Sequence, residues 1–537
     1  MKKKLFYWNI FFLTFINCFA QEIKIIEIRK AAASTQDQEK FPGANILLSN
    51  DEKKVNLFHD GGLIISDKAY FYSKKNSFKA VGNVIFTQGD TIKLTCNSIE
   101  YDGNLKLANA YGNVNLNSPD MNLRTDSLFM DRINNTAFYN SKGIIIDSLT
   151  TLTSNKGIYF MNDNKYQFMS NVKIKNPRYK VNSERLDYFT KLNEAFFYKK
   201  SNITGETYNI FCDEGYYDMN VEKGFFKNNA IIYYDNKIIK GDSLYFENEL
   251  EYASAVNNIS IIDSINNTII QGHYGEVFKA KDSAIITKRA LAINIIDNDS
   301  LFIHADTLIT TGPEQKRIMR GFYDVRIFRK DLKGKSDSIY IDESIGLTKL
   351  FKKPLVKIEK QTLTESQRNL KNPILWFEKT QMTGDEIFLL SDTNTKKLDS
   401  LKINGNVFII EKDSLSNKGF NQIKGGILKG SFIEGKLNYI NIIKNTEMVY
   451  YLYSDVDQKL IGIDKTTCSE MKINFSKGEI GEITFLVSPN GEVYPEKDIP
   501  INERTLKGFI WRKDEMPISI RNLFSEDDND LELKIKK

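Results

Sequence analysis

Hydrophobic and polar positions recur along this chain with a period of about thirty residues. Between Asn83 and Ile345 an apolar–x–apolar run follows a small residue nine times, usually with an Asx or Gly just before it. Successive copies are 28 to 32 residues apart. A fixed period of this size indicates repeats that stack on one another. The clearest copies are Asn97-Ser98-Ile99-Glu100-Tyr101, Asp126-Ser127-Leu128-Phe129-Met130, Lys156-Gly157-Ile158-Tyr159-Phe160 and Asp242-Ser243-Leu244-Tyr245-Phe246.

A second phrase lies about midway between copies of the first. It begins with Gly-Asn, or Asn alone, and continues with alternating apolar residues, as in Gly82-Asn83-Val84-Ile85-Phe86 and Gly112-Asn113-Val114-Asn115-Leu116. Gly and Asn tolerate positive φ, which predicts turns, whereas alternation with period two predicts strands. Each repeat is therefore predicted to hold two strands of about ten to thirteen residues separated by turns. No proline occurs between Pro177 and Pro313, which suits an unbroken hydrogen-bonded ladder.

The alternation places the apolar residues of both phrases on one face of their strands. Two such faces turned towards each other would form one long apolar interior. Packed shut, this interior is a core; slightly open, it is a groove that could hold acyl chains, and the sequence does not choose between them. The predicted inward residues are Val84, Phe86, Ile99, Tyr101, Val114, Leu116, Leu128, Met130, Ile144, Ile158, Phe160, Val172, Leu186, Leu244 and Phe246.

The chain offers little that resembles an active site. It has three histidines, His59, His273 and His304, and none belongs to a zinc-binding pattern. We expect His273 and His304 on strand surfaces. The Asp that recurs before Ser, as at Asp126 and Asp242, is interpreted as turn chemistry in which the carboxylate caps its own backbone. We therefore predict no catalytic residue, no metal site and no cofactor.

The N-terminus has the pattern of a secretory signal. Lys2-Lys3-Lys4 is a basic start, residues 5–16 are apolar, and cleavage is expected after Ala20. Lipidation of Cys18 is an open alternative. Loss of the three lysines lowers the net charge from +5 to about +2, which argues against electrostatic binding of nucleic acid.

Three cysteines follow the signal: Cys96, Cys212 and Cys468. An odd number leaves at least one thiol free in an exported protein. We expect all three to act as buried small apolar side chains.

The regular period ends near Phe351, and two prolines, Pro354 and Pro373, follow it. The predicted division is a signal peptide at 1–20, an N-terminal lead-in at 21–59, jellyroll repeats at 60–350 and a linker or inserted loop at 351–375. A second, less regular β-rich jellyroll-like domain is placed at 376–520. The charged residues 521–537 are predicted to be disordered.

A cleaved signal followed by repeated A-x-G-N-V phrases and D-S-apolar phrases resembles the OstA/LptA-like family, in a Bacteroidetes-type long form. The strongest window runs from Ala80-Val81-Gly82-Asn83-Val84 to Asp126-Ser127-Leu128. The resemblance covers residues 60–350 well and 376–480 loosely. It implies an all-β fold, an elongated V-shaped β-jellyroll or β-taco of stacked antiparallel strands. It also implies a periplasmic, non-enzymatic bridge or carrier that takes lipopolysaccharide to the outer membrane, with the lipid A acyl chains in the cleft.

The resemblance further implies partners. These are lipopolysaccharide itself and related jellyroll domains of the inner- and outer-membrane transport machinery, joined end to end; self-association of the chain is left open. Two other functions stay open. One is a structural or outer-membrane assembly scaffold with a closed core. The other is a secreted carbohydrate-binding β-helix, which a cluster of aromatic residues and carboxylates on one outer face would support; the sequence reveals no such cluster.

Overall fold

The structure is a computed structural model that describes residues 24–524, except 119–120, 148, 266, 297–298, 314–315, 354–363, 414, 416–418 and 477–478. The predicted signal peptide and residues 525–537 lie outside the described residues. The chain divides into two compact units. Unit 1 comprises Met1–Pro177 and Asn182–Leu192, and unit 2 comprises Arg178–Val181 and Asn193–Lys537. No helix among the described residues is long and apolar enough to cross a membrane.

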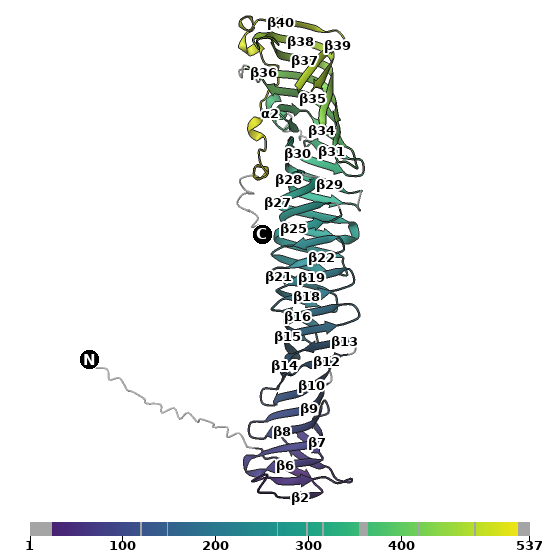
Figure 1. Cartoon of the computed structure of the whole chain (residues 1–537), viewed down its shortest axis with the longest axis vertical. Coiled ribbons are helices and arrows are strands. Elements are labelled where there is room, and N and C mark those ends of the chain that lie inside the picture. Colours follow the sequence, from purple (N-terminus) through teal and green to yellow (C-terminus); the bar gives the residue numbers. More distant parts are fainter. Residues whose placement is uncertain are drawn as a thin grey trace, which may run out of the picture. The chain divides into compact units, whose positions relative to one another are not determined.

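The elements of unit 1 are strands and one short 3-10 helix, η1 (Ser73–Lys75) (Figure 1). The strands are β1 (Glu27–Lys30), β2 (Ala33–Thr35), β3 (Asn45–Leu48), β4 (Val55–His59), β5 (Gly62–Ser66), β6 (Lys68–Tyr72), β7 (Ser77–Gln88), β8 (Ile92–Asp102), β9 (Leu107–Ser118), β10 (Met121–Asp131), β11 (Thr136–Tyr139), β12 (Gly143–Asp147), β13 (Thr150–Ser154), β14 (Lys156–Phe160), β15 (Lys165–Lys175) and most of β16 (Lys180–Phe189).

The described residues of unit 2 also form mainly strands, together with a short α-helix, α2 (Glu365–Leu370), and a 3-10 helix, η2 (Lys279–Lys281). The strands are β17 (Glu194–Phe197), β18 (Ser201–Thr204), β19 (Tyr208–Cys212), β20 (Glu214–Asp218), β21 (Lys223–Lys227), β22 (Ile231–Tyr234), β23 (Lys237–Lys240), β24 (Ser243–Glu247), β25 (Tyr252–Asp263), β26 (Thr268–Phe278), β27 (Ser283–Ile296), β28 (Asp299–Thr311), β29 (Ile318–Phe328), β30 (Leu332–Asp342), β31 (Leu347–Phe351), β32 (Ile374–Phe377), β33 (Thr380–Thr383), β34 (Glu386–Ser391), β35 (Leu398–Lys412), β36 (Phe420–Ile433), β37 (Lys436–Tyr453), β38 (Leu460–Ser476), β39 (Glu479–Leu486) and β40 (Asn490–Tyr494).

Each long strand bends in the middle, and the bend creates two walls within a unit. In β7 and β8, residues 77–81 pair with 98–102, residues 84–88 pair with 92–96, and the register shifts between the two halves. We call the side that contains 77–81 wall A and the side that contains 84–88 wall B. The bends form a corner that the walls share, and the chain-reversing turns lie on the opposite side, which we call the mouth. In unit 2, β20, β21 and β24 belong to wall A, and β19, β22 and β23 belong to wall B.

The two repeated phrases meet at the corner. Gly82 and Asn83 have φ values of +82° and +44°, as the Gly-Asn pattern predicted. The side chain of Asn83 donates to the carboxylate of Asp67 at 2.8 Å. Asn258 donates in the same way to Asp242 at 2.7 Å, so the recurrent Asp joins two strands, whereas the sequence predicted a bond to its own backbone. Gly82 is required because a Cβ there would lie 2.7 Å from the Asp67 carboxylate.

The pairings confirm the predicted all-β class and are consistent with a jellyroll. The pairs that carry the repeats, such as β8 with β9 and β25 with β26, are antiparallel, which excludes a parallel β-helix for these repeats. The predicted strand lengths hold for β7 to β10, which have 11 or 12 residues each. The role given to Gly-Asn was wrong, because these residues bend a strand in its middle instead of reversing the chain.

The end of the described chain forms a strap across the outer face of wall B in unit 2. The strap comprises residues 495–524 and contains four 3-10 helices: η3 (Glu496–Asp498), η4 (Ile501–Glu503), η5 (Lys513–Glu515) and η6 (Ile520–Leu523). Its Leu523 is fully buried and Phe524 is 8% exposed, so the described part of the predicted disordered tail, residues 521–524, is instead anchored to the sheet by these two side chains.

Candidate functional site

The walls of both units enclose an apolar interior that is closed to water. Tyr208 of wall B contacts Phe246 of wall A, with ring centroids 4.7 Å apart. Most predicted inward residues are at most 5% exposed, so the interior is a packed core in this structure. The residues whose inward position is confirmed are Val84, Phe86, Ile99, Tyr101, Val114, Leu116, Leu128, Met130, Val172, Leu186, Leu244 and Phe246. Their contact with lipid stays a prediction.

Three of the predicted inward residues point the other way. Ile144, Ile158 and Phe160 are only partly buried, while their neighbours Ile145 and Tyr159 are 2% and 7% exposed. The prediction was wrong by one position in both strands. It treated the glycine of each phrase as the small residue outside the interior, whereas the glycine itself holds an inward position.

One tyrosine explains why glycine is inward here. A Cβ on Gly143 would lie 2.3 Å from Cζ of Tyr139, and a Cβ on Gly157 would lie 2.6 Å from Cε1 of the same ring. Tyr139 is 2% exposed, and its hydroxyl shares a 2.6 Å hydrogen bond with Ser154 Oγ. A single large ring thus fills the space of two inward side chains, and the apolar pattern moves by one residue.

Polar side chains cross the mouth of unit 1 from wall to wall. His59 of wall B shares a 2.8 Å hydrogen bond with the hydroxyl of Tyr101 of wall A. Arg132, in a wall A turn, donates to Tyr101 at 2.8 Å, to the Asp60 carbonyl at 2.8 Å and to Gln88 of wall B at 3.2 Å. Burial raises the pKa of Tyr101, so its hydroxyl stays protonated. The inward aromatic layer therefore ends at the mouth in a bonded polar group.

An ion pair lies beside this group. The carboxylate of Asp60, in the β4–β5 turn of wall B, is 2.5 Å from Nζ of Lys106, which belongs to the β8–β9 turn of wall A. Lys24 contacts the same carboxylate. Hydrogen bonds from Lys106 and then Lys24 hold the pKa of Asp60 well below its usual value. Asp60 is therefore ionised throughout the neutral range, and the mouth of unit 1 carries three cations, Lys24, Lys106 and Arg132.

Ion pairs cross the mouth of unit 2 in the same way. Arg178 is 3.2 Å from Glu222, Lys279 is 2.9 Å from Asp235, and Arg317 pairs with Asp263. In each pair one residue belongs to a wall A turn and the other to wall B or the chain that leads into it. The hydroxyls of Tyr208 and Tyr217 also meet across the mouth at 2.6 Å, and burial raises the pKa of both. We call the cross-mouth bonds of each unit its mouth seam.

Sequence reasoning missed the mouth seam. The partners are far apart in the chain, 46 residues for Asp60 and Lys106 and 54 for Asp263 and Arg317, so they come from turns of different repeats. Charged residues in turns are ordinarily a solvated surface, and the spacing alone does not distinguish a seam from it. The signal that could have found it is an acid in a wall B turn followed about one and a half repeats later by a base in a wall A turn.

The remaining candidate residues are structural. Cys96, Cys212 and Cys468 are free and buried, as predicted, and burial raises the pKa of Cys96 and Cys212 to about 12. His304 is fully buried and its ring contacts Phe524 of the strap at 5.0 Å, so its predicted surface position was wrong. His273 is also buried. The described residues contain no group of three side chains suited to hold a metal ion.

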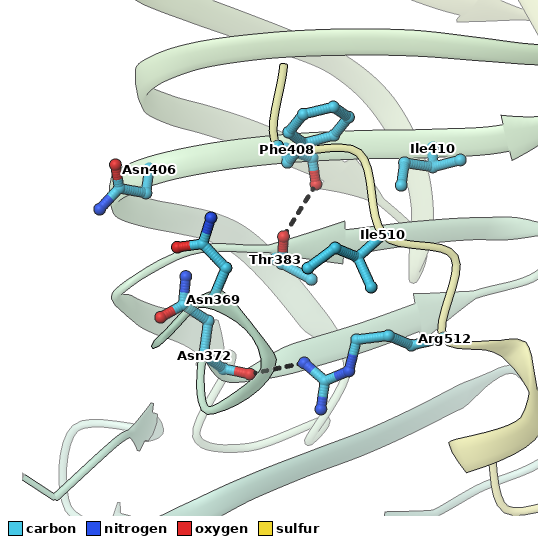
Figure 2. Close-up of a pocket in the computed structure, with 9 residues that line it drawn as sticks. Asn369, Asn372, Thr383, Asn406, Phe408, Ile410, Ile510 and Arg512 are labelled. Carbon is cyan, nitrogen blue, oxygen red and sulfur yellow. Dashed lines mark hydrogen bonds between the residues drawn. The ribbon is translucent and has the colours of Figure 1, made fainter. Parts of the chain in front are cut away.

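A small pocket lies between the strap and wall B of unit 2 (Figure 2). Phe408, Ile410 and Ile510 form its apolar side. Arg512 borders it, and its guanidinium donates to the Asn372 carbonyl at 2.9 Å and to Glu515. The guanidinium of Arg512 is thus bound by groups of the same chain. These bonds anchor the strap beside the pocket.

Part of the repeated region is similar to a known protein family. Residues 23–184 match a family model described as OstA-like protein. No curated protein matches the sequence. Among solved structures, LptH, the LptA-homologous periplasmic component of the lipopolysaccharide transport device from Pseudomonas aeruginosa, is 18% identical and covers 25% of this chain and 79% of that one. The TM-score of this match is 0.14. The fold is therefore assigned from the strand pairings described above and not from this structure. The similarity to OstA-like proteins therefore extends over residues 23–184.

Proposed function

We propose that this protein is a periplasmic bridge or carrier in lipopolysaccharide transport, with acyl chains held between its two walls. The observation that carries the proposal is the apolar interior of each unit, lined by both walls and bordered at the mouth by a polar seam. The OstA-like match over residues 23–184 supports it. The chemistry is partition of lipid and involves no bond cleavage.

Entry of an acyl chain requires the walls to part at the mouth. An exposed ion pair contributes about 0–1 kcal/mol, and an acyl chain that leaves water gains about 0.8 kcal/mol for each buried CH₂. A few methylene groups therefore offset the loss of one seam pair. The corner, held by backbone hydrogen bonds and by bonds such as Asn83 to Asp67, is the hinge side that stays closed.

The cations of the mouth seam suit the phosphates of lipid A. Lys106, Lys24 and Arg132 lie where the apolar interior of unit 1 meets solvent, and the single carboxylate of Asp60 pairs with both lysines while the mouth is closed. Parting of the walls separates Lys106 from Asp60 and leaves cations beside the headgroup. Guanidinium and ammonium groups bind phosphate through charge-assisted hydrogen bonds.

The first strands of unit 1 suit pairing with another jellyroll. β1 pairs with β4, β2 pairs with β3, and every residue of β1 and β2 is exposed. Open strand edges accept a strand from a partner chain. Energy for directional movement would come from such a partner.

Site-specific photo-crosslinking tests lipid contact. A photoreactive residue at Phe86 or Leu128 is expected to form an adduct with lipopolysaccharide in living cells. Ile158, which is only partly buried and faces outwards, is the matched control on the same wall as Leu128. Equal labelling at Leu128 and Ile158, or labelling at neither, would count against an interior lipid site.

The close packing of the interior favours a second function, a scaffold whose core never opens. A double variant, Asp60→Cys with Lys106→Cys, bridged by a bismaleimide, decides between the two functions. Cys96, Cys212 and Cys468 are buried, so in the mature chain the reagent is directed to the new pair. A bridge that must open loses lipid adducts at Leu128 when the mouth is locked, whereas a scaffold keeps its cellular function.

A further inference from the structure

The outer face of wall A in unit 2 carries a line of aromatic rings. In the central column, Phe196 pairs with Tyr216, Tyr216 with Phe225, and Phe225 with Tyr245. The line then moves to the neighbouring column, where Tyr252 pairs with Phe278. We call these six residues the aromatic ladder; they lie on β17, β20, β21, β24, β25 and β26, successive strands of one wall.

Rings are in contact in three cross-strand pairs of the ladder. Centroids are 5.0 Å apart for Phe196 and Tyr216, 4.8 Å for Phe225 and Tyr245, and 5.2 Å for Tyr252 and Phe278. Phe225, near the middle, is 53% exposed. The other rings are partly exposed, so the ladder is a surface of ring faces and edges and not part of the core.

Carboxylates and hydroxyls are interleaved with the rings. The Tyr245 hydroxyl donates to Glu247. The Tyr252 and Tyr274 hydroxyls both donate to Glu276, at 3.0 and 2.7 Å. Each carboxylate is an acceptor with several lone pairs and keeps capacity for further donors. The ladder therefore offers flat apolar faces next to fixed hydrogen-bond acceptors.

Sheet stability alone does not explain the rings. The outer face of wall B in the same repeats carries one exposed ring pair, Phe211 with Tyr233, and otherwise polar and aliphatic residues such as Ile231, Ile238 and Ile262. Such residues satisfy strand preference and cross-strand packing. Wall A of these repeats carries a line of six rings where wall B carries a single pair, which indicates a role for that face beyond strand pairing.

We propose that the aromatic ladder is a docking face for an uncharged glycan chain. The C–H faces of a pyranose pack against flat aromatic rings, and its hydroxyls are donors for the carboxylates of Glu247 and Glu276. A line of rings repeated at the strand spacing suits a chain of sugars. Lys223 and Lys227 share this face of β21 with Phe225, but Lys223 lies opposite Asp218 and Glu247, and Lys227 lies opposite Glu214. These two cations are balanced by neighbouring carboxylates and do not form a site for phosphorylated or uronic acid polymers, which favours a neutral glycan. This is the cluster that a carbohydrate-binding function requires and that the sequence did not reveal, and it is independent of the interior.

Affinity electrophoresis of the mature chain tests the proposal. The gels contain a neutral β-glucan, α-glucan, mannan or galactan, or anionic polygalacturonate. Retardation by at least one neutral polymer is expected, and Phe225→Ala with Tyr245→Ala should weaken it about tenfold or more. Retardation by none of the four neutral polymers, or by polygalacturonate alone, overturns the proposal.

Two further variants separate binding from folding. Phe211→Ala with Tyr233→Ala removes an exposed ring pair from wall B, with centroids 5.7 Å apart, and should leave retardation unchanged. Phe225→Tyr with Tyr245→Phe keeps both rings and should retain binding even if the alanine variant is less stable. Equal loss in the wall A and wall B alanine variants, or loss in the ring-preserving variant, rejects the ladder as the binding face.

Discussion

The outer face of unit 1 and the part of wall B in unit 2 that the strap covers meet solvent differently. In unit 1 large apolar residues of the outer face, such as Tyr111 and Phe138, remain 37% and 45% exposed. In unit 2 the strap buries Val449 and Ile463 of the outer face completely. Each repeat of unit 1 is thus held mainly by its neighbours, whereas residues 495–524 tie distant strands of unit 2 together. A stacked repeat protein can therefore contain a region of local stability and a region made cooperative by one crossing segment.

The strap uses two kinds of contact. Ile499 and Leu506 pack into the cluster formed by Phe408, Ile410 and Tyr451. Two outward-facing glutamines hold its backbone. The side chain of Gln381 donates to the Ile510 carbonyl and accepts from the Arg512 amide, both at 2.8 Å. Gln422 does the same with Arg504 and Leu506, at 2.9 and 2.8 Å.

Deletion of residues 495–537 should cause the largest change in the stability of unit 2 relative to unit 1. Burial of one large apolar side chain contributes about 1.5–3 kcal/mol, so loss of Ile499, Leu506 and Leu523 should cost unit 2 several kcal/mol. The remaining tryptophan of the mature chain, Trp376, is buried in unit 2 and reports its unfolding in urea. Hydrogen exchange in β7–β10 of unit 1 is the internal control and should not change. An unchanged Trp376 transition would show that the strap adds no stability.

Replacement of the two glutamines sharpens the comparison, because it keeps the apolar strap residues. Gln381→Ala leaves the Ile510 carbonyl and the Arg512 amide without their partner, and Gln422→Ala does the same at Arg504 and Leu506. Each change should destabilise unit 2 by about 1–3 kcal/mol, the cost of an unsatisfied buried polar group. Urea unfolding followed by tryptophan fluorescence measures it. Gln271→Ala, on the partly exposed side of β26, is the matched control and should change little.

Much of the repeat was predictable because it depends on local patterns. Alternation placed Ile99 and Leu128 inward, and the Gly-Asn pattern predicted positive φ at Asn83. The strap and the mouth seam were not predictable in this way. Gln381 and Gln422 have no local feature that distinguishes them from exposed glutamines, and their partners lie more than eighty residues away. Local periodicity thus specifies the walls, while contacts between distant segments decide which faces are closed.

Tyr139 fills the space of two inward side chains, at Gly143 and Gly157, and so breaks the alternation of apolar and polar residues that otherwise predicts the inward positions. Gly143→Ala should destabilise unit 1 by about 1–3 kcal/mol, because its Cβ would overlap the ring of Tyr139. Hydrogen exchange in β11–β14 measures the effect. The same change in a Tyr139→Leu background should cost less, since the ring is gone, and a double-mutant cycle gives the coupling. Equal cost in both backgrounds would mean that backbone change, and not the ring, excludes a side chain at position 143.

Loss of one ion pair of the mouth seam should change stability least of all these variants. It is also the change most closely linked to the proposed function. The pKa of Asp60 is lowered in the folded state, so its stabilising contribution is complete above about pH 4, the ordinary value for an aspartate, and is lost as the pH falls towards the folded pKa. Lys106→Met should therefore reduce the stability of unit 1 at pH 7 by about 0–1 kcal/mol and weaken its dependence on acid below pH 4. Hydrogen exchange in β4, β5 and β8 at pH 7 and, with corrected intrinsic rates, at pH 3 measures both. If Lys106→Met raises lipid adducts at Leu128 while barely changing stability, the seam acts as a closure of the interior; if adducts fall with stability unchanged, Lys106 serves mainly to hold the lipid headgroup.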